Sequence, residues 1–184
     1  MIIMTSYGAK ELAGSFRTVR KNTIQIASEI PEDQYGFQAA PGTRTIGQLL
    51  IHIASASRLA EQLHIAGKRT TLAGFNFMEI FGEMGAEEQA PHTKDQIIAK
   101  LTENGARFGD ALEGLSDEFL SERVGMLPGM QPESKSRIEM LLGVKEHEMH
   151  HRAQLMLLER MLGHVPHLTR EMQARMAAMA SATK

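Results

Sequence analysis

The sequence has no cysteine and no tryptophan, and only 5% of its 184 residues are aromatic. Without cysteine the chain forms neither disulfides nor thiolate metal sites, and it has no cysteine nucleophile. The same absence fits a reducing compartment. Long hydrophobic runs are missing as well, because no stretch approaches the roughly 18 consecutive apolar residues of a membrane-spanning helix. We therefore expect no membrane partner.

The chain also lacks an excess of charge of one sign. It carries 20 Lys and Arg residues against 22 Asp and Glu residues, which gives a formal net charge of −2. Nucleic-acid-binding proteins usually carry a basic excess, so we expect no nucleic-acid partner. Residues 1–7 lack the basic start and apolar run of a signal peptide, and a cytoplasmic protein is therefore expected. Two residue types are plentiful instead, with 8 His and 13 Met.

Most of the chain has the hydrophobic period of an α-helix, with apolar residues recurring at spacings of three and four. This pattern predicts four long helices, over residues 5–29, 45–67, 93–112 and 134–163. Thr45 and Thr93 are suitable N-caps for the second and third of these helices, and Ser134 or Ser136 is expected to begin the fourth. Pro31 is expected to end the first of these helices, and Gly163 is expected to end the fourth.

Two further segments complete the predicted architecture. Residues 68–93 form a long crossover between the second and third long helices, with a short helix inside it. Residues 169–179 form an extra C-terminal helix. Because strand-like alternation is weak throughout, we expect an all-α fold. The predicted fold is a four-helix bundle in which residues 1–184 form a single domain.

The fourth long helix carries two histidines within an otherwise apolar stripe. The stripe advances by steps of three and four residues and consists of Met140, Val144, His147, His151, Leu155, Leu158 and Leu162. Buried imidazoles need partners, and histidines at positions i and i+4 are close enough to share a metal ion. Spacing alone leaves two interpretations open. His147 and His151 are metal ligands, or they are core histidines with hydrogen-bond partners.

A third candidate ligand is His52, at the margin of the apolar face of the second long helix. It joins the other two if these helices face each other across the bundle. His150 lies about 100° around the helix from His151, so we expect it to flank the stripe. His64 is expected to cap its helix or to lie in solvent. We assign no chemistry to the histidines of the connections, which are His92, His164 and His167.

Residues 147–151 also match the H-E-x-x-H motif of zinc peptidases. In that interpretation Glu148 is the general base. The extended form of the motif needs a glycine and a further histidine where this sequence has Gln154 and Leu157. Glu171 is the remaining candidate for a third ligand. A zinc peptidase is therefore kept as the less favoured alternative.

Two segments resemble the signatures of the DinB-like superfamily. Residues 40–54, Ala-Pro-Gly-Thr-Arg-Thr-Ile-Gly-Gln-Leu-Leu-Ile-His-Ile-Ala, are similar to its loop and second helix. Residues 146–154 are similar to its second signature, a helical His-x-x-x-His-Arg-x-Gln. Ala153 departs from the glycine that the family often has there. The resemblance covers nearly the whole chain, from the first predicted helix to about Gly163.

The resemblance implies a four-helix bundle with a long crossover, often a homodimer, and a divalent metal, commonly zinc or nickel, held by three histidines. By position these histidines are His52, His147 and His151. Related enzymes, such as mycothiol-dependent maleylpyruvate isomerases and bacillithiol transferases, use a low-molecular-weight thiol. The resemblance thus predicts a metal-dependent enzyme with a small-molecule substrate, either a thiol-dependent S-transferase or a hydrolase. A metal-binding or stress-response protein without catalytic turnover is the alternative.

Three neutral imidazoles leave a divalent metal with an open position, which a water or a substrate thiol can take. The thiol would arrive with a cofactor, since the chain has no cysteine. Glu148, Gln154 and Gln48 are the candidates for orienting the imidazoles. We expect Arg152 to be a solvated charge rather than an anion clamp. The three methionines of residues 172–179 should pack on the bundle or on a second chain.

Overall fold

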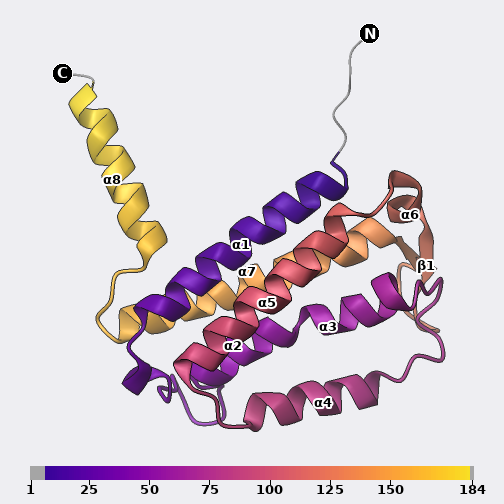
Figure 1. The fold of residues 1–184 in the computed structure, drawn as a ribbon, viewed down its shortest axis with the longest axis horizontal. Helices are drawn as coiled ribbons and strands as arrows, with labels where there is room; N and C mark the ends of the chain where they lie inside the picture. Colours follow the sequence, from indigo (N-terminus) through magenta and orange to yellow (C-terminus); the bar gives the residue numbers. More distant parts are fainter. Residues whose placement is uncertain (1–6, 183–184) are drawn as a thin grey trace.

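The computed structural model describes residues 7–182. Four long helical segments make up the bundle in Figure 1: α1 (Ala9–Glu29), the run of α2 (Ile46–Ser55), α3 (Ser57–Ala60) and η2 (Glu61–Ala66), then α5 (Lys94–Glu113) and α7 (Arg137–Met161). Helix α1 packs against α5 and α7, and α2 packs against the same two helices. The predicted all-α four-helix bundle is confirmed. Residues 1–6 lie outside the described residues. They include the first two positions of the predicted first helix and most of the N-terminal segment that lacks the pattern of a signal peptide.

Side-chain caps begin three of the long helices where the sequence predicts them. The hydroxyl of Thr45 accepts the backbone N–H of Gln48 at 3.2 Å. Thr93 and Ser136 cap α5 and α7 in the same way. At its other end α7 is followed by Gly163, whose φ of 85° lies in the left-handed region that glycine adopts without strain. Local capping therefore sets the bounds of the helices that carry the site.

Two apolar clusters along the bundle hold these helices together. In one cluster the rings of Phe16 and Phe108 meet edge to face, with centroids 5.0 Å apart. The other joins one buried side chain from each long segment, namely Ile26, Leu50, Ile97 and Leu155. The burial of each such side chain contributes about 1.5–3 kcal/mol to the stability of the folded state. The helices that carry the candidate ligands are thus parts of one packed scaffold.

The predicted crossover between the second and third long segments contains α4 (Phe77–Gln89), which packs against α2 (Figure 1). Asn76 caps its first turn by accepting the N–H of Glu79. Only two of its side chains are buried, those of Ile80 and Glu88. The crossover therefore lays a mostly exposed helix alongside α2.

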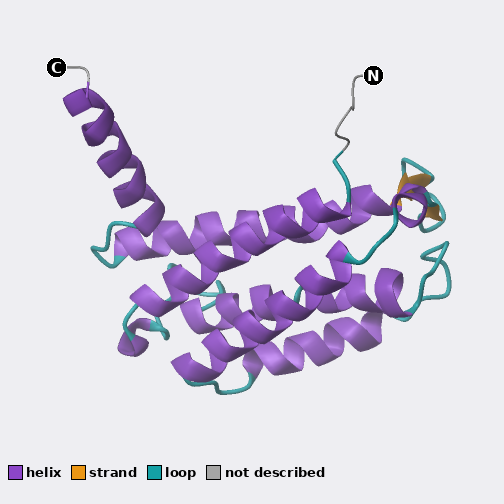
Figure 2. Cartoon of the chain, turned by 45° about the horizontal axis from the view of Figure 1, so that its top comes forward, coloured by secondary structure: helices purple, strands orange, loops and turns teal. Residues whose placement is uncertain are grey.

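Short elements fill the remaining connections. The turn η1 (Glu32–Gln34) follows α1, and α6 (Asp117–Ser121) follows α5. A two-stranded antiparallel hairpin, β1 (Arg123–Gly125) with β2 (Ser134–Ser136), then leads into α7 (Figure 2). These strands were not expected from the sequence, because three residues per strand are too few for an alternating pattern to be visible.

The extra C-terminal helix is α8 (His167–Ala182), which extends away from the bundle in Figures 1 and 2. Its methionines are exposed, with exposed fractions of 58% for Met172, 64% for Met176 and 71% for Met179. They are not part of the bundle core, and their packing on a second chain stays a prediction. Within residues 7–182, no helix combines the length and apolar character needed to cross a membrane.

Candidate metal centre

Three histidines from two helices meet inside the bundle. His52 lies on α2, and His147 and His151 lie one turn apart on α7. Nε2 of His147 is 3.1 Å from Nε2 of His52 and 3.1 Å from Nε2 of His151. The nearest ligand atoms of all three residues lie within 4.8 Å of one another. The structure therefore brings together the three candidate ligands that the sequence analysis singles out.

A second contact joins the same two helical segments farther along. Arg137, the first residue of α7, donates from Nη1 to Nδ1 of His64 in η2 at 3.0 Å. Because His64 follows His52 in its segment while Arg137 precedes His147 in α7, the two segments run antiparallel. Both residues of this second contact are buried. The expectation that His64 caps its helix or lies in solvent is wrong, because its partner comes from α7 rather than from its own helix.

The histidine cluster fits a divalent metal. Each neutral imidazole has one N–H, so His147 cannot satisfy both neighbouring nitrogens at once through Nε2. A tetrahedral zinc ion with nitrogen ligands at about 2.0–2.1 Å separates those nitrogens by about 3.3–3.4 Å. The observed separations of 3.1 Å are close to this value. Two of the three nitrogen separations are thus near the spacing that a shared metal ion would impose, so the three histidines could hold one.

Two of the three rings have an oxygen beside Nδ1. His52 Nδ1 lies 3.2 Å from Oε2 of Glu88 on α4, and His151 Nδ1 forms a hydrogen bond of 2.8 Å with Oε1 of Gln154. An oxygen at this position favours the tautomer that is protonated on Nδ1, which leaves the lone pair of Nε2 for a metal. Nδ1 of His147 is buried and has no hydrogen-bond partner among residues 7–182.

Burial keeps these imidazoles neutral. It lowers the pKa of His52 and of His147 to about 4, and it also lowers the pKa of His151. The positive charge of Arg44 adds to the lowering for all three. Neutral imidazole is the form that binds metal, so the cluster is ready to bind a metal at neutral pH.

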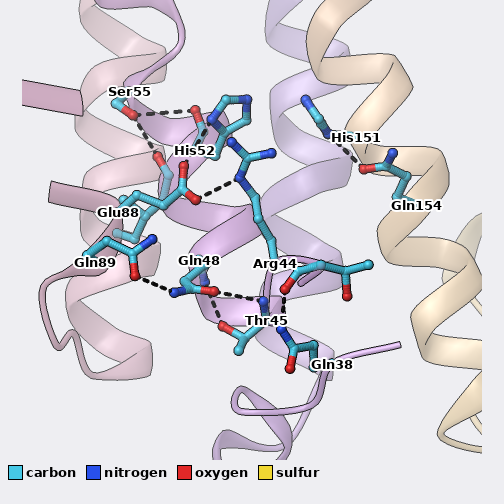
Figure 3. A network of polar contacts seen from close by, with 12 residues as sticks. Gln38, Arg44, Thr45, Gln48, His52, Ser55, Glu88, Gln89, His151 and Gln154 are labelled. Atoms are coloured by element: carbon cyan, nitrogen blue, oxygen red, sulfur yellow. Dashed lines mark hydrogen bonds and ion pairs between the residues drawn. The ribbon is translucent and has the colours of Figure 1, made fainter. Parts of the chain in front are cut away.

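Figure 3 shows the polar groups that surround His52. Glu88 accepts from Nε of Arg44 at 2.7 Å through the oxygen that does not face His52. Gln48 does not orient a histidine: it accepts the N–H of Thr45 at 3.0 Å and donates to Gln89. The prediction for Gln154 is confirmed, and the prediction for Gln48 is wrong.

Glu148 forms a separate buried ion pair. Its side chain is 1% exposed and accepts from Nε and Nη2 of Arg20, each at 2.9 Å at its nearest. Arg20 also donates to the backbone oxygen of Leu101 at 2.9 Å. With its carboxylate held by Arg20, Glu148 orients no imidazole, and that prediction is wrong. Glu171, the third ligand of the peptidase alternative, is exposed on α8 and outside the cluster.

The remaining polar candidates lie around the cluster or away from it. His150 is exposed at the flank, 3.2 Å from Nε2 of Gln154, as predicted. Arg152 is half-buried rather than fully solvated, and burial lowers the pKa of its guanidinium. His92 contacts the Glu87 carbonyl, and His164 contacts Gln34. These residues do not line the cavity described next.

A cavity of about 670 Å³ opens beside His52 and His147. Its size is within the range of small-molecule sites, about 300–1,000 Å³. Much of its wall is apolar and consists of Leu59, Leu63, Phe81, Met84, Met126, Met140 and Val144. The first half of the predicted α7 stripe thus faces the cavity, while Leu141 and Glu148 face the core there. The second half, with Leu155 and Leu158, is buried as predicted.

Sequence reasoning missed two residues of this site, Glu88 and Arg44. Glu88 belongs to the crossover helix, and the order of residues does not reveal which of its acids faces His52. Arg44 lies within the segment that resembles the DinB-like signature, but nothing in its spacing connects it with the histidines. The one signal in the sequence that could have pointed to Glu88 was an acid-rich helix within a long crossover, because long crossovers often contain functional residues.

Comparisons with solved structures identify the fold. YfiT from Bacillus subtilis, described as a probable metal-dependent hydrolase with an unusual four-helix bundle topology, is 17% identical, with a TM-score of 0.66 over 89% of this chain and 93% of that chain. The DinB-like protein YjoA from Bacillus subtilis is 19% identical, with a TM-score of 0.62 over 84% and 94%. A mycothiol-dependent maleylpyruvate isomerase is 18% identical, with a TM-score of 0.61 over 83% of this chain and 63% of that one.

At the level of sequence, no curated protein gives a significant match. A family profile does match, and its description is the DinB superfamily. The match covers residues 15–155, which include His52, His147, His151 and most of the bundle. Because this region is more than half of the chain, the chain belongs to the DinB superfamily.

Proposed function

We propose that this protein is a divalent-metal-dependent enzyme in which His52, His147 and His151 hold the metal. The observation that carries the proposal is the convergence of three neutral Nε2 atoms beside a cavity of about 670 Å³. Structural metal sites are closed by four protein ligands, whereas catalytic sites keep a position open. Three protein ligands next to a cavity fit the catalytic arrangement better than a purely structural one.

The reaction we propose is hydrolysis or thiol transfer on a small molecule. When bound, the metal supplies a Lewis acid with an open position, and imidazole ligands suit zinc or nickel. Glu88 and Gln154 hold two of the rings in the ligating orientation. The apolar wall binds the non-reacting part of the substrate and excludes water from it. A thiol would enter as a low-molecular-weight cofactor, because the chain has no cysteine.

The solved relatives give this proposal its context. One is described as a probable metal-dependent hydrolase and another as a mycothiol-dependent isomerase. The buried pair of Glu148 with Arg20 and the exposed position of Glu171 count against the peptidase alternative. A measurement of turnover distinguishes an enzyme from the alternative, a metal-binding protein without catalytic activity.

Metal content of the untagged protein, measured by elemental mass spectrometry, is the first test. We expect about one zinc or nickel ion per chain, and its loss in His52→Ala and His147→Ala with helix content unchanged. His164→Ala is the matched control, since this histidine contacts Gln34 away from the cluster. Wild-type protein that binds neither metal after reconstitution would overturn the proposal.

Turnover is the second test. The metal-loaded protein is screened with carboxylic esters and lactones, and with electrophiles in the presence of a low-molecular-weight thiol. We expect turnover that disappears in His147→Ala. Full metal occupancy without turnover of either class would favour the non-catalytic alternative.

A further inference from the structure

The guanidinium of Arg44 lines the cavity with most of its donors unused. Arg44 precedes α2, and its only hydrogen bond to residues 7–182 runs from Nε to Glu88 at 2.7 Å. An arginine has five N–H donors in a planar fork, so both terminal nitrogens remain available for a ligand. The side chain is 41% exposed, which lets a ligand reach these nitrogens.

This guanidinium is held beside the histidines. One oxygen of Glu88 accepts from Arg44 and the other lies 3.2 Å from Nδ1 of His52, so one carboxylate fixes both groups. The charge of Arg44 lowers the pKa of His52, His147 and His151, which places the guanidinium within electrostatic reach of all three. In Figure 3 the guanidinium lies in the space between His52 and His151.

The other charges along the cavity leave this position favourable for an anion. Glu88 is paired with Arg44, and Glu139 is bound to the cap of α7. Glu146, which also lines the cavity, is exposed, so water screens its charge. Lys135 lies on β2, two residues before α7 begins, and His147 lies ten residues into α7. The helical part of that separation, the ten residues from Arg137 to His147, alone corresponds to about 15 Å.

We propose that Arg44 binds the carboxylate of an elongated and otherwise apolar molecule that occupies this cavity. The edge formed by the two terminal nitrogens of the guanidinium is unused, and it can donate two parallel N–H bonds to the two oxygens of one carboxylate. A phosphate dianion fits less well, because the carboxylate of Glu88 is adjacent, and among residues 7–182 the lining offers Lys135 as the only other Lys or Arg. The apolar wall then takes the hydrocarbon part. The inference rests on the proposed function, since it takes the cavity as the place where the reactant binds.

Calorimetric titration with straight-chain carboxylates from butanoate to decanoate, and with the matching primary amides, tests the inference. Zinc-loaded and metal-stripped protein are titrated in parallel, because a metal also attracts carboxylates. We expect affinity to rise about two- to fourfold per methylene, and octanoate to bind at least tenfold more tightly than octanamide. Arg44→Gln should weaken octanoate at least tenfold in both forms while octanamide stays within twofold. Arg44→Lys should retain part of the preference.

Arg58→Gln is the matched control. Arg58 also pairs with an acid of α4, Glu87, but it does not line the cavity. Thermal unfolding of each variant verifies that the fold is retained. We expect Arg58→Gln to bind octanoate as the wild type does.

Three results would overturn the inference: equal affinity for octanoate and octanamide, unchanged octanoate binding in Arg44→Gln, or tighter binding of inorganic phosphate than of octanoate. Each of these can occur in a protein that binds one metal per chain and turns over substrate, so the proposed function would stand. Conversely, a protein that binds no metal but shows octanoate binding dependent on Arg44 would retain this inference and lose the proposed function.

Discussion

Two side chains from different helices decide how the imidazoles are presented. Glu88 of α4 contacts Nδ1 of His52, and Gln154 of α7 contacts Nδ1 of His151. Nδ1 of the third ring, that of His147, has no such partner among the described residues. Groups that orient metal ligands commonly matter for affinity almost as much as the ligands.

Replacement of Glu88 by glutamine should therefore weaken metal binding about 10- to 100-fold. The change removes the negative charge that stabilises the Nδ1–H of His52 and makes its Nε2 a better ligand. Competition with a chromophoric chelator measures the zinc affinity. Glu83→Gln, at an exposed position of the same helix, is the control. Equal zinc affinity in Glu88→Gln and wild type would mean that this contact does not tune the site.

The buried pair of Arg20 and Glu148 gives a prediction about stability instead. Both side chains are 5% exposed or less, so removing one charge leaves the other buried without its partner. We expect Glu148→Gln to lower the free energy of unfolding by about 3–5 kcal/mol. Urea denaturation followed by circular dichroism measures it, with the exposed Glu103→Gln as control. A variant with unchanged stability and abolished turnover would instead identify Glu148 as a catalytic base.

Single residues also mark the limit of what the sequence predicts. The i, i+4 spacing of His147 and His151 places them together whatever the rest of the fold does. His52 was assigned to the same site because its segment resembles a family signature. The contact of Glu88 with His52 spans two helices, and the direction in which α4 crosses α2 is set by tertiary packing. No periodicity within either helix encodes it.

At the scale of elements, α7 shows why a regular stripe is an incomplete guide to burial. Its predicted stripe assumes one apolar environment along the whole helix, but the environment changes midway. In the first half the stripe lines a cavity, and Leu141 and Glu148 face the core. In the second half Leu155 and Leu158 enter the core as predicted. A cavity inside the bundle has no signature in hydrophobic spacing.

The C-terminal end of α7 carries a buried acid that should make stability depend on pH. Glu159 is 1% exposed, and its Oε2 has no hydrogen-bond partner among residues 7–182. Burial, reinforced by the negative charge of Glu29, raises the pKa of Glu159 from 4.5 to about 7. The folded protein therefore holds this proton more tightly than the unfolded chain.

The resulting stabilisation is fully present below pH 4.5 and is lost as the pH rises through about 7. It amounts to at most about 3 kcal/mol. Glu159→Gln should remove this slope and be more stable than wild type at pH 8. Urea unfolding at pH 5, 6, 7 and 8 measures the difference. Parallel pH profiles for wild type and Glu159→Gln would show that Glu159 titrates normally.

At the scale of the whole molecule, α8 contacts α1 near its start, where Arg170 pairs with Glu29, and then extends away from the bundle (Figure 1). It exposes apolar side chains at Met172 and Met176, and short isolated helices are only marginally stable in water. The homodimer implied by family resemblance would give this helix a partner, and it stays a prediction.

Sedimentation velocity tests that prediction. We expect a dimer at micromolar concentration and a monomer for the double variant Met172→Asp and Met176→Asp, with the unfolding temperature of the bundle retained. The exposed Gln173→Ala on the same helix should sediment like wild type. A wild-type monomer at 100 µM, a concentration on the order of that in crystallisation trials, would exclude a stable dimer.

Ion pairs help to attach the wall that α4 forms beside the cavity. Apart from the burial of Ile80 and Glu88, ion pairs join it to neighbouring segments, from Glu88 to Arg44 and from Glu87 to Arg58 and Lys100. These pairs are partly exposed, so dissolved salt weakens them. Ionic strength would then control how readily this wall parts from the bundle. Metal exchange and ligand entry should both be faster in concentrated salt than in dilute buffer.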